Sequence, residues 1–351
     1  MDEALDAYAD LGRLRPAGPL GISGRAWLVE AGRRRFVLRR FPPALSLTQA
    51  RFAAAVQHRV ARAGGPATPV VADTSGRLVV TAGGQPYMMV VYSPGECLPD
   101  AVPGPGRCWE FGRTLGRLHL CLRSFPELTD LAPPDGHGPD PVGALTRALS
   151  RHGPGCPHPD ARHVLAAKLA RAERLSAPEW ALVRRRPDTV IHGDFHLGNV
   201  VIQNGRVGTV LDYDLARRCA QGYEVVRGLL YCAKPAGGYP AFASRVRAFL
   251  TGYFEVAPLP EEEVARMVEL FRAVQVLDPY GLDVCTGASD GLVRFGLARF
   301  SLLRWVEVYG AVLTALAVEA GQATSPRRRR WSSSQRALRF ESQRTARRAS
   351  A

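Results

Sequence analysis

The alternation of apolar and polar residues separates a strand-rich first third of the chain from a mostly helical remainder. Two short β-like runs, 27–29 and 36–38, flank Gly32 and several arginines, which predicts a hairpin within residues 20–40. Further strands are expected near residues 68–71, 78–80 and 87–92.

One helix is expected among these strands. Ser46 and Gln49 match the capping-box pattern, and apolar residues then recur every four positions as far as Val60. The Gly-Gly-Pro at 64–66 ends the pattern, so the helix should cover residues 46–63. The first third is therefore predicted to be a small sheet with one helix.

After a Pro- and Gly-rich segment at 93–106, the apolar period becomes helical, with steps of three and four residues from Cys108 to Leu122. Residues 124–161 are expected to form a long loop around one short helix, and residues 189–212 are strand-like. Further helices are expected at 160–185, 223–233, 240–254, 261–276 and 291–320.

This order predicts an α+β fold of two lobes with a cleft between them: a small N-terminal antiparallel sheet with one helix, then a larger, mainly helical lobe. The expected parts are an N-terminal lobe (1–92), a hinge and connector (93–106), a C-terminal lobe (107–324) and a basic tail (325–351) that should be disordered.

Composition favours a globular, intracellular protein. Of 351 residues, 46% are hydrophobic and 22% charged, which argues against a disordered chain. No uncharged apolar run approaches the ~20 residues of a membrane helix, and the N-terminus lacks a secretory signal. The seven cysteines are scattered without a C-x-x-C pair, as expected for a reducing compartment. We therefore expect a cytoplasmic protein without a membrane partner.

The net charge of +14 does not favour a nucleic-acid partner once it is divided along the chain. Residues 326–351 hold nine Arg and one Glu, or +8, and the rest holds 37 basic and 31 acidic residues, or +6. Only the tail could then support nucleic-acid binding, and most such runs are solvated. Four residues could also suggest a zinc site, but their spacing fits no standard site: His152, Cys156, His158 and His163.

The candidate chemistry lies in residues 190–200 and the hairpin after them. A polar loop places Asp194 five residues before Asn199, and an Asn-Gly turn at 204–205 leads to a strand that ends at Asp212. Because a tight turn brings the outer ends of both strands together, these three side chains should converge. Oxygen ligands for Mg²⁺ beside a carboxylate for the attacking hydroxyl are what phosphoryl transfer needs.

This pattern resembles the aminoglycoside phosphotransferase/choline kinase superfamily, whose catalytic loop reads H-G-D-x-H-x-x-N and is followed by D-x-D/E. The two motifs match here at His192, Gly193, Asp194, His196, Asn199, Asp212 and Asp214. The L-G-R-L-H at 115–119 resembles a helix of that family, and 87–96 its strand-to-hinge segment. The resemblance covers residues 11–320 and implies a protein-kinase-like fold that uses ATP and Mg²⁺.

The resemblance also implies roles for individual residues. Asp194 would orient the acceptor hydroxyl or accept its proton, with His192 and His196 supporting the loop. Asn199 and Asp212 would bind Mg²⁺, and Asp214 would be a further ligand or a structural residue. The remaining nucleotide contacts would be Arg39 at the α- and β-phosphates, backbone amides around Gly21 and Gly24 over the phosphates, and Val91 and Tyr92 near the adenine. His119 is interpreted as a hydrogen-bonded core histidine.

One departure from the family concerns the partner of Arg39. The usual helix glutamate is missing, because no Asp or Glu occurs between Glu30 and Asp73, and Gln49 and Gln57 are the remaining candidates to orient Arg39. An arginine is ionised without help and binds phosphate bidentately, so turnover is expected to survive.

The leading hypothesis is thus an ATP- and Mg²⁺-dependent phosphotransferase for a small-molecule hydroxyl, on an amino alcohol, a homoserine-like compound, a sugar or an aminoglycoside antibiotic. The alternative is a catalytically impaired nucleotide-binding regulator of the same fold. Asp278, Tyr280 and Asp283 are weak candidates for acceptor contacts, and the oligomeric state is left open.

Overall fold

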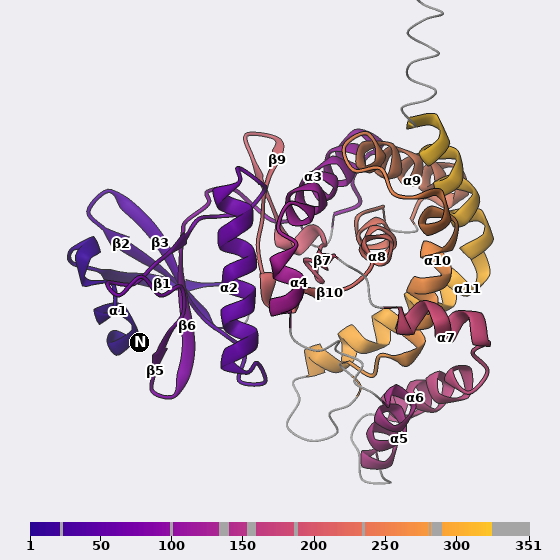
Figure 1. Ribbon diagram of the computed structural model, residues 1–351, viewed down its shortest axis with the longest axis horizontal. Helices are drawn as coiled ribbons and strands as arrows, with labels where there is room; N and C mark the ends of the chain where they lie inside the picture. The colour runs from indigo at the N-terminus through magenta and orange to yellow at the C-terminus, as the bar shows by residue number, and fades with distance from the viewer. Residues whose placement is uncertain are drawn as a thin grey trace, which may run out of the picture.

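A sheet and a helical bundle lie side by side in the computed structural model (Figure 1). The structure describes residues 1–324 except 22–23, 99–100, 133–139, 153–158, 186–188, 234–235, 281 and 283–289, and the side chains of 290–292. The basic tail, Asp283 and two of the zinc candidates, Cys156 and His158, lie outside the described residues.

The small lobe is an antiparallel sheet in the order β1-β2-β3-β6-β4, with β5 paired to β6. Its strands are β1 (Arg15–Leu20), β2 (Ala26–Ala31), β3 (Arg34–Arg40), β4 (Val70–Val71), β5 (Val80–Ala82) and β6 (Gln85–Val91). The predicted hairpin is β2–β3. The sequence pattern missed β1 and the short helix α1 (Asp2–Asp6), which are too short or too rich in Pro and Gly to show a period.

The two faces of the sheet are covered by different helices. Tyr8, which follows α1, is fully buried against residues such as Phe36 and Leu38. Helix α2 (Leu47–Arg62) packs Ala50 and its neighbours on the other face, and its predicted capping box at Ser46 is confirmed. A second side of α2, with Val56, enters the core of the large lobe. Helix α2 therefore joins the two lobes.

The large lobe is mainly helical, as predicted, and several helices surround α8 (Figure 1). Its helices are α3 (Pro105–Arg123), α4 (Glu127–Leu131), α5 (Pro141–Arg151), α6 (Pro159–Ala172), α7 (Ala177–Arg184), α8 (Gln221–Ala233), α9 (Gly238–Phe254), α10 (Glu261–Leu277) and α11 (Asp290–Thr324). Residues 124–161 hold both α4 and α5, where the sequence predicted one short helix. The residue boundaries expected for the lobes stay predictions.

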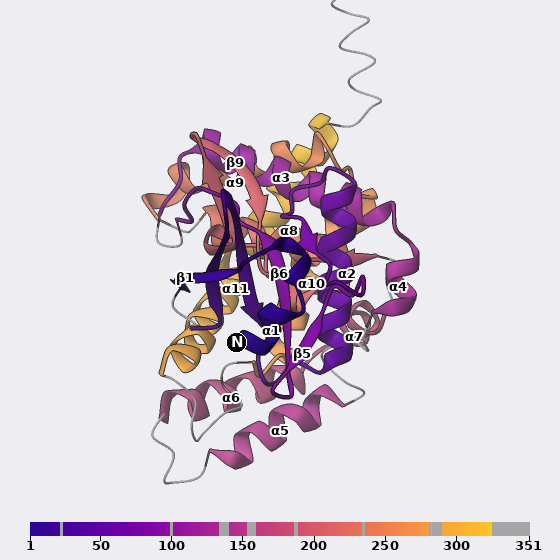
Figure 2. The same cartoon turned by 90° about the vertical axis from the view of Figure 1, so that its left-hand side faces the viewer.

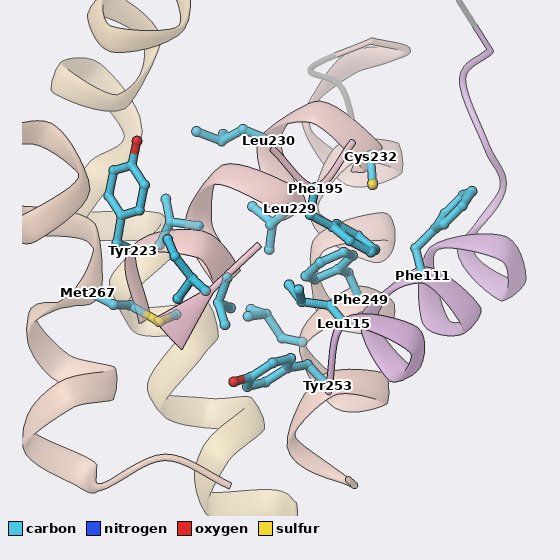
Figure 3. Packing of buried hydrophobic residues seen from close by; sticks show 14 of the residues in the cluster. Phe111, Leu115, Phe195, Tyr223, Leu229, Leu230, Cys232, Phe249, Tyr253 and Met267 are labelled. Carbon is cyan, nitrogen blue, oxygen red and sulfur yellow. The ribbon is translucent and has the colours of Figure 1, made fainter. Parts of the chain in front are cut away.

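Helices α3 and α9 cross so closely that glycine is required at the crossing. A Cβ at Gly112 would lie 1.9 Å from the carbonyl oxygen of Phe249, and one at Gly252 would lie 2.2 Å from that of Trp109. Figure 3 shows the side chains that fill the core beside this crossing, with Phe195 of the loop after β7 (Val190–Ile191) among them. The catalytic-loop candidate is thus anchored in the core.

Two features lie at the periphery of the large lobe. Helices α5 and α6 pack on each other at its lower end in both views (Figures 1 and 2), over a separate cluster around Leu145 and Leu165. Residues Val293–Thr324 of α11 are long and apolar enough, by length and composition alone, to cross a membrane. Because α11 packs on α9 and α10 through side chains such as Leu313 and Ala317, this is weak evidence for a membrane segment.

Candidate active site

The loop after β7 (Val190–Ile191) adopts a conformation that requires glycine. Gly193 has a φ of +82°, and a Cβ there would lie 2.0 Å from the carbonyl oxygen of Leu215. Only glycine combines this backbone angle with so close a contact. The glycine of the motif therefore lets the loop turn sharply just before Asp194.

The hairpin after the loop forms as predicted. Strands β8 (Val200–Gln203) and β9 (Arg206–Val210) pair antiparallel, and Asn204 and Gly205 have φ angles of +51° and +74°, as a tight hairpin turn needs. Beyond the strands, the N–H of Leu211 donates to the carbonyl oxygen of Asn199 over 2.8 Å. This bond brings Asn199 next to Asp212, at the outer end of the hairpin.

Asp194 is held from three directions. The Nδ2 of Asn199 donates to Oδ2 of Asp194 at 2.9 Å and to its carbonyl oxygen at 3.0 Å. His196 Nε2 lies 3.5 Å from the same Oδ2, and Arg227 of α8 forms an ion pair with Oδ1. Burial opposes ionisation of Asp194, but the charge of Arg227 and the His196 contact together hold its pKa far below the usual range. Asp194 is therefore a fixed carboxylate.

Asp212 and Asp214 are joined by Arg39, from strand β3 of the other lobe. The Nη2 of Arg39 donates to Oδ1 of Asp212 and to Oδ2 of Asp214, each over 2.6 Å. The expectation that Gln49 or Gln57 orients Arg39 is wrong: Gln49 completes the capping box at Ser46, and Gln57 donates to Thr68. The missing helix glutamate is thus replaced by the two aspartates themselves.

The Asp212–Asp214 pair has the properties of an incomplete cation site. Among the described residues, Oδ1 of Asp214 is buried without a hydrogen-bond partner, and burial raises the pKa of Asp214 to about 6 against the charge of Arg39. A buried carboxylate oxygen in this state costs free energy unless a cation or donor reaches it. Among the described residues no cluster of three His, Cys, Asp or Glu forms a metal site, so a metal here would need the amide oxygen of Asn199.

A buried carboxylate that sequence reasoning missed fixes the backbone of the candidate catalytic loop. The two oxygens of Glu224, in α8, accept from the backbone N–H groups of His192, at 2.9 Å, and Gly193, at 2.5 Å. Its Oε2 also lies 2.9 Å from His119 Nε2, whose other ring nitrogen contacts Tyr253. His119 is therefore the hydrogen-bonded core histidine that the sequence predicted.

His192 is likewise buried as a structural residue. Its Nε2 contacts the carbonyl oxygen of Leu211 at 2.9 Å, and burial lowers the pKa of its imidazole. His196 accepts from the N–H of Gly198 through Nδ1, so it braces the loop on the side of Asp194. Both positions agree with the expected supporting roles, which stay predictions until they are measured.

The predicted nucleotide contacts lie in the small lobe. Gly21 and Gly24, with φ angles of +67° and +61°, lie between β1 and β2 in the chain. The N–H groups of Val91 and Tyr92 already donate within the sheet, to Pro69 and Arg35. An adenine at that point would have to bind backbone carbonyl oxygens instead of these N–H groups. The predicted contact of Val91 and Tyr92 with adenine therefore stays a prediction.

Arg227 and Glu224 could have been noticed only as charged residues inside an apolar helix. Both lie in α8, where the sequence predicts a helix at 223–233; the structure buries both side chains, and buried ionised groups need partners. Nothing in their spacing says that those partners are Asp194 and the amides of residues 192–193. The structure supplies that information.

Comparison with known proteins places the chain among phosphate-transferring enzymes. Residues 16–259 match the family described as "Phosphotransferase enzyme family". A homoserine kinase of Methylobacillus glycogenes is 28% identical over 281 residues, which are 79% of this chain and 81% of that protein. A homoserine kinase of Azorhizobium caulinodans is 26% identical over 255 residues, which are 72% of this chain and 74% of that protein.

Solved structures resemble the chain in fold at low identity. Spectinomycin phosphotransferase APH(9)-Ia, bound to AMP, has a TM-score of 0.58 at 11% identity, and covers 91% of this chain and 96% of that one. Amicoumacin kinase hAmiN, in complex with AMP-PNP, Ca²⁺ and Ami, has a TM-score of 0.56 at 13% identity, and covers 83% of this chain and 87% of that one. The predicted protein-kinase-like fold is confirmed.

Proposed function

Since this chain belongs to the phosphotransferase enzyme family and is a small-molecule kinase, we propose that it transfers the γ-phosphoryl group of ATP to the hydroxyl of a small amino alcohol, with homoserine as the first acceptor to test. One observation carries the proposal: Asn199, which is hydrogen-bonded to the fixed carboxylate of Asp194, lies next to an aspartate pair whose buried Oδ1 has no partner among the described residues. The names of the relatives support the choice of acceptor.

Asp194 would act on the acceptor hydroxyl. The acceptor oxygen bonds to the γ-phosphorus, the bond from that phosphorus to the β–γ bridging oxygen breaks, and the hydroxyl proton leaves through Asp194 to solvent. Because its pKa is far below the usual range, Asp194 is a weak base. Its main contribution would be to orient the hydroxyl through a hydrogen bond, with proton transfer late in the step.

Asn199, Asp212 and Asp214 fit a divalent cation such as Mg²⁺. Their donors are hard oxygens, one of which is buried without a partner. When bound, the ion supplies charge neutralisation for the phosphate oxygens. Arg39, now held by both aspartates, would turn one or more of its five N–H donors to the α- and β-phosphates.

The remaining assignments follow from position. Backbone amides around Gly21 and Gly24 would lie over the phosphates, with Val91 and Tyr92 beside the adenine. His192 and His196 would keep the loop in place. A cytoplasmic location would suit an enzyme of this kind, because ATP is its substrate.

An acceptor screen tests the proposal. The purified protein is incubated with ATP, Mg²⁺ and homoserine, 3-aminopropan-1-ol, sugars or aminoglycosides, and phosphorylated product is measured by mass spectrometry. We expect transfer to at least one acceptor and its loss in Asp194→Asn, which should still bind ATP in calorimetry. Mg²⁺-dependent ATP binding without transfer to any acceptor would support the alternative of an impaired regulator.

A further inference from the structure

One face of helix α8 carries two tyrosines and an arginine next to the catalytic loop. Tyr223, Arg227 and Tyr231 follow one another at intervals of four residues, so they share that face. The guanidinium of Arg227 lies 4.9 Å from the ring centre of Tyr231 and pairs with Asp194. The ring of His196 lies 6.1 Å from that of Tyr231. This face of α8 therefore adjoins the carboxylate that would receive the acceptor hydroxyl.

A second arginine approaches from helix α11. Arg299 is only 7% exposed, and its Nη2 donates to Asp278 Oδ2 at 2.6 Å and to Gln275 Oε1 at 3.0 Å. The amide of Gln275 donates in turn to the hydroxyl of Tyr223 at 2.9 Å, which links α11 to the face of α8. Within the part of the chain that the structure describes, the Nε and Nη1 groups of Arg299 make no hydrogen bond.

Tyr280 contacts Arg299 and lies within electrostatic range of Asp194. The guanidinium of Arg299 lies 5.6 Å from the Tyr280 ring centre, and the phenol is close enough to Asp194 for that carboxylate to raise its pKa, after the larger effect of burial. Tyr280 is 42% exposed, so this end of the cluster is open to solvent.

Among the described residues, positively charged side chains outnumber carboxylates around this cluster. Arg217 of β10 (Arg217–Arg218) stacks 5.3 Å from the Tyr223 ring centre, and among the described residues it has no ion pair or hydrogen bond. Lys168 is buried, with Nζ on carbonyl oxygens of residues 275 and 278. Among the described residues these two, with Arg227 and Arg299, are four cations around the three carboxylates of Asp194, Glu224 and Asp278. Within this part of the chain the positive groups exceed the negative ones by one, which favours an anionic ligand.

We propose that Arg227, Tyr231, Tyr280 and Arg299 form the acceptor-binding cluster of this kinase, and that the acceptor is a small hydroxy acid whose carboxylate binds the free donors of Arg299. With the carboxylate there, the hydroxyl end of the molecule lies at Asp194. The alternative is that Arg299 only ties α11 to α10. This inference rests on the proposed function and deepens it, because it names the group that distinguishes true acceptors from other alcohols.

A matched pair of acceptors tests the inference. L-Homoserine and 3-aminopropan-1-ol share the hydroxyl, the ammonium group and the three-carbon spacing between them, and differ in the carboxylate. We expect kcat/KM for homoserine to exceed that for 3-aminopropan-1-ol by about 100-fold or more, since a site built for a polar group rejects the analogue that lacks it. Equal use of both acceptors would overturn the inference and leave the proposed function standing; transfer to no acceptor would overturn both.

Variants at Arg299 separate recognition from structure. In Arg299→Gln the preference for homoserine should collapse by tenfold or more, mostly through KM, and Arg299→Lys should keep part of it because the charge remains. Arg304→Gln, at an exposed position of the same helix, is the control and should keep the full preference. If Arg299→Gln unfolds, as judged by circular dichroism, Arg299→Lys decides alone. A folded Arg299 variant with the wild-type preference would refute the assignment.

Discussion

The guanidinium of Arg227 forms an ion pair with Asp194 and also donates to the carbonyl oxygen of Phe195, the next residue of the loop. One buried side chain therefore fixes both the carboxylate and the backbone beside it. Because both partners lie in the large lobe, this contact does not depend on the position of the small lobe.

The first prediction concerns this ion pair. Arg227→Met should lower kcat by about 100-fold, because a misplaced reacting group commonly costs that much. Arg227→Lys should recover part of the loss, since it restores a charge but not the second contact. The readout is kcat at saturating ATP and acceptor, together with the pH profile, whose acidic limb should move to higher pH as Asp194 loses its cation. A loss of stability with unchanged kcat would contradict a positioning role.

The second prediction concerns Arg39 and Mg²⁺. Removing this cation in Arg39→Gln leaves Asp212 and Asp214 adjacent without a counter-charge, which should destabilise the metal-free protein by about 3 kcal/mol. Mg²⁺ should then raise the melting temperature of Arg39→Gln more than that of the wild type, because the ion no longer competes with the guanidinium. Arg33→Gln, at an exposed position just before β3, is the control. Equal Mg²⁺ effects in all three proteins would argue against a metal at these aspartates.

The third prediction concerns the stability role of Glu224. Burial opposes its ionisation, but the hydrogen bond from His119 and nearby positive charges lower its pKa. A lowered pKa in the folded state contributes stability above the ordinary glutamate pKa of about 4.3, and this is lost as the pH falls through the folded value. Glu224→Gln should therefore lower the free energy of unfolding by about 3 kcal/mol at pH 7, with a smaller difference from wild type in acid.

Urea denaturation at pH 7 and at acid pH measures this difference. Glu262→Gln, at an exposed position in the first turn of α10, should change the unfolding free energy little at either pH. A difference between Glu224→Gln and wild type that stays constant with pH would show that Glu224 is not the titrating group.

The fourth prediction concerns the crossing of α3 and α9. Gly112→Ala forces the helices apart, because the new methyl would lie 1.9 Å from the carbonyl oxygen of Phe249, and should cost about 2 kcal/mol or more. Gly106→Ala lies in the same helix with nothing within 4 Å of its Cβ, so it should be neutral or stabilising. Thermal unfolding of the two variants compares them directly; equal melting temperatures would mean that the crossing yields without cost.

Local signals were enough for the features that depend on a few neighbouring residues. The capping box at Ser46 and the hairpin turn at 204–205 are encoded within four residues, and both are confirmed. The candidate catalytic loop was recognisable from the sequence because its motif contains Gly193, the glycine that the sharp backbone turn requires. Local reasoning gave the wrong partners for Arg39. Whether the side chains of Gln49 and Gln57 can contact Arg39 depends on how α2 packs, which the sequence pattern does not show.

The features that were missed depend on contacts between distant segments. Arg227 and Glu224 act on residues more than thirty positions earlier, and no period along the chain records such a contact. Strand β1 was missed for a different reason: its two prolines and one glycine hide the alternation that marks a strand.

Helix α8 carries both the carboxylate that holds the backbone of residues 192–193 and the arginine that holds Asp194. A slide of this one helix by a fraction of its pitch would disturb both holds at once. Changes in its packing, such as a side chain at Gly222, whose Cβ would lie 2.7 Å from Met267, should thus inactivate the enzyme by displacing Asp194 and its loop, with every reacting group still present. Loss of activity in natural variants of this helix would then reflect a displacement of Asp194 and its loop, and not the removal of a reacting group.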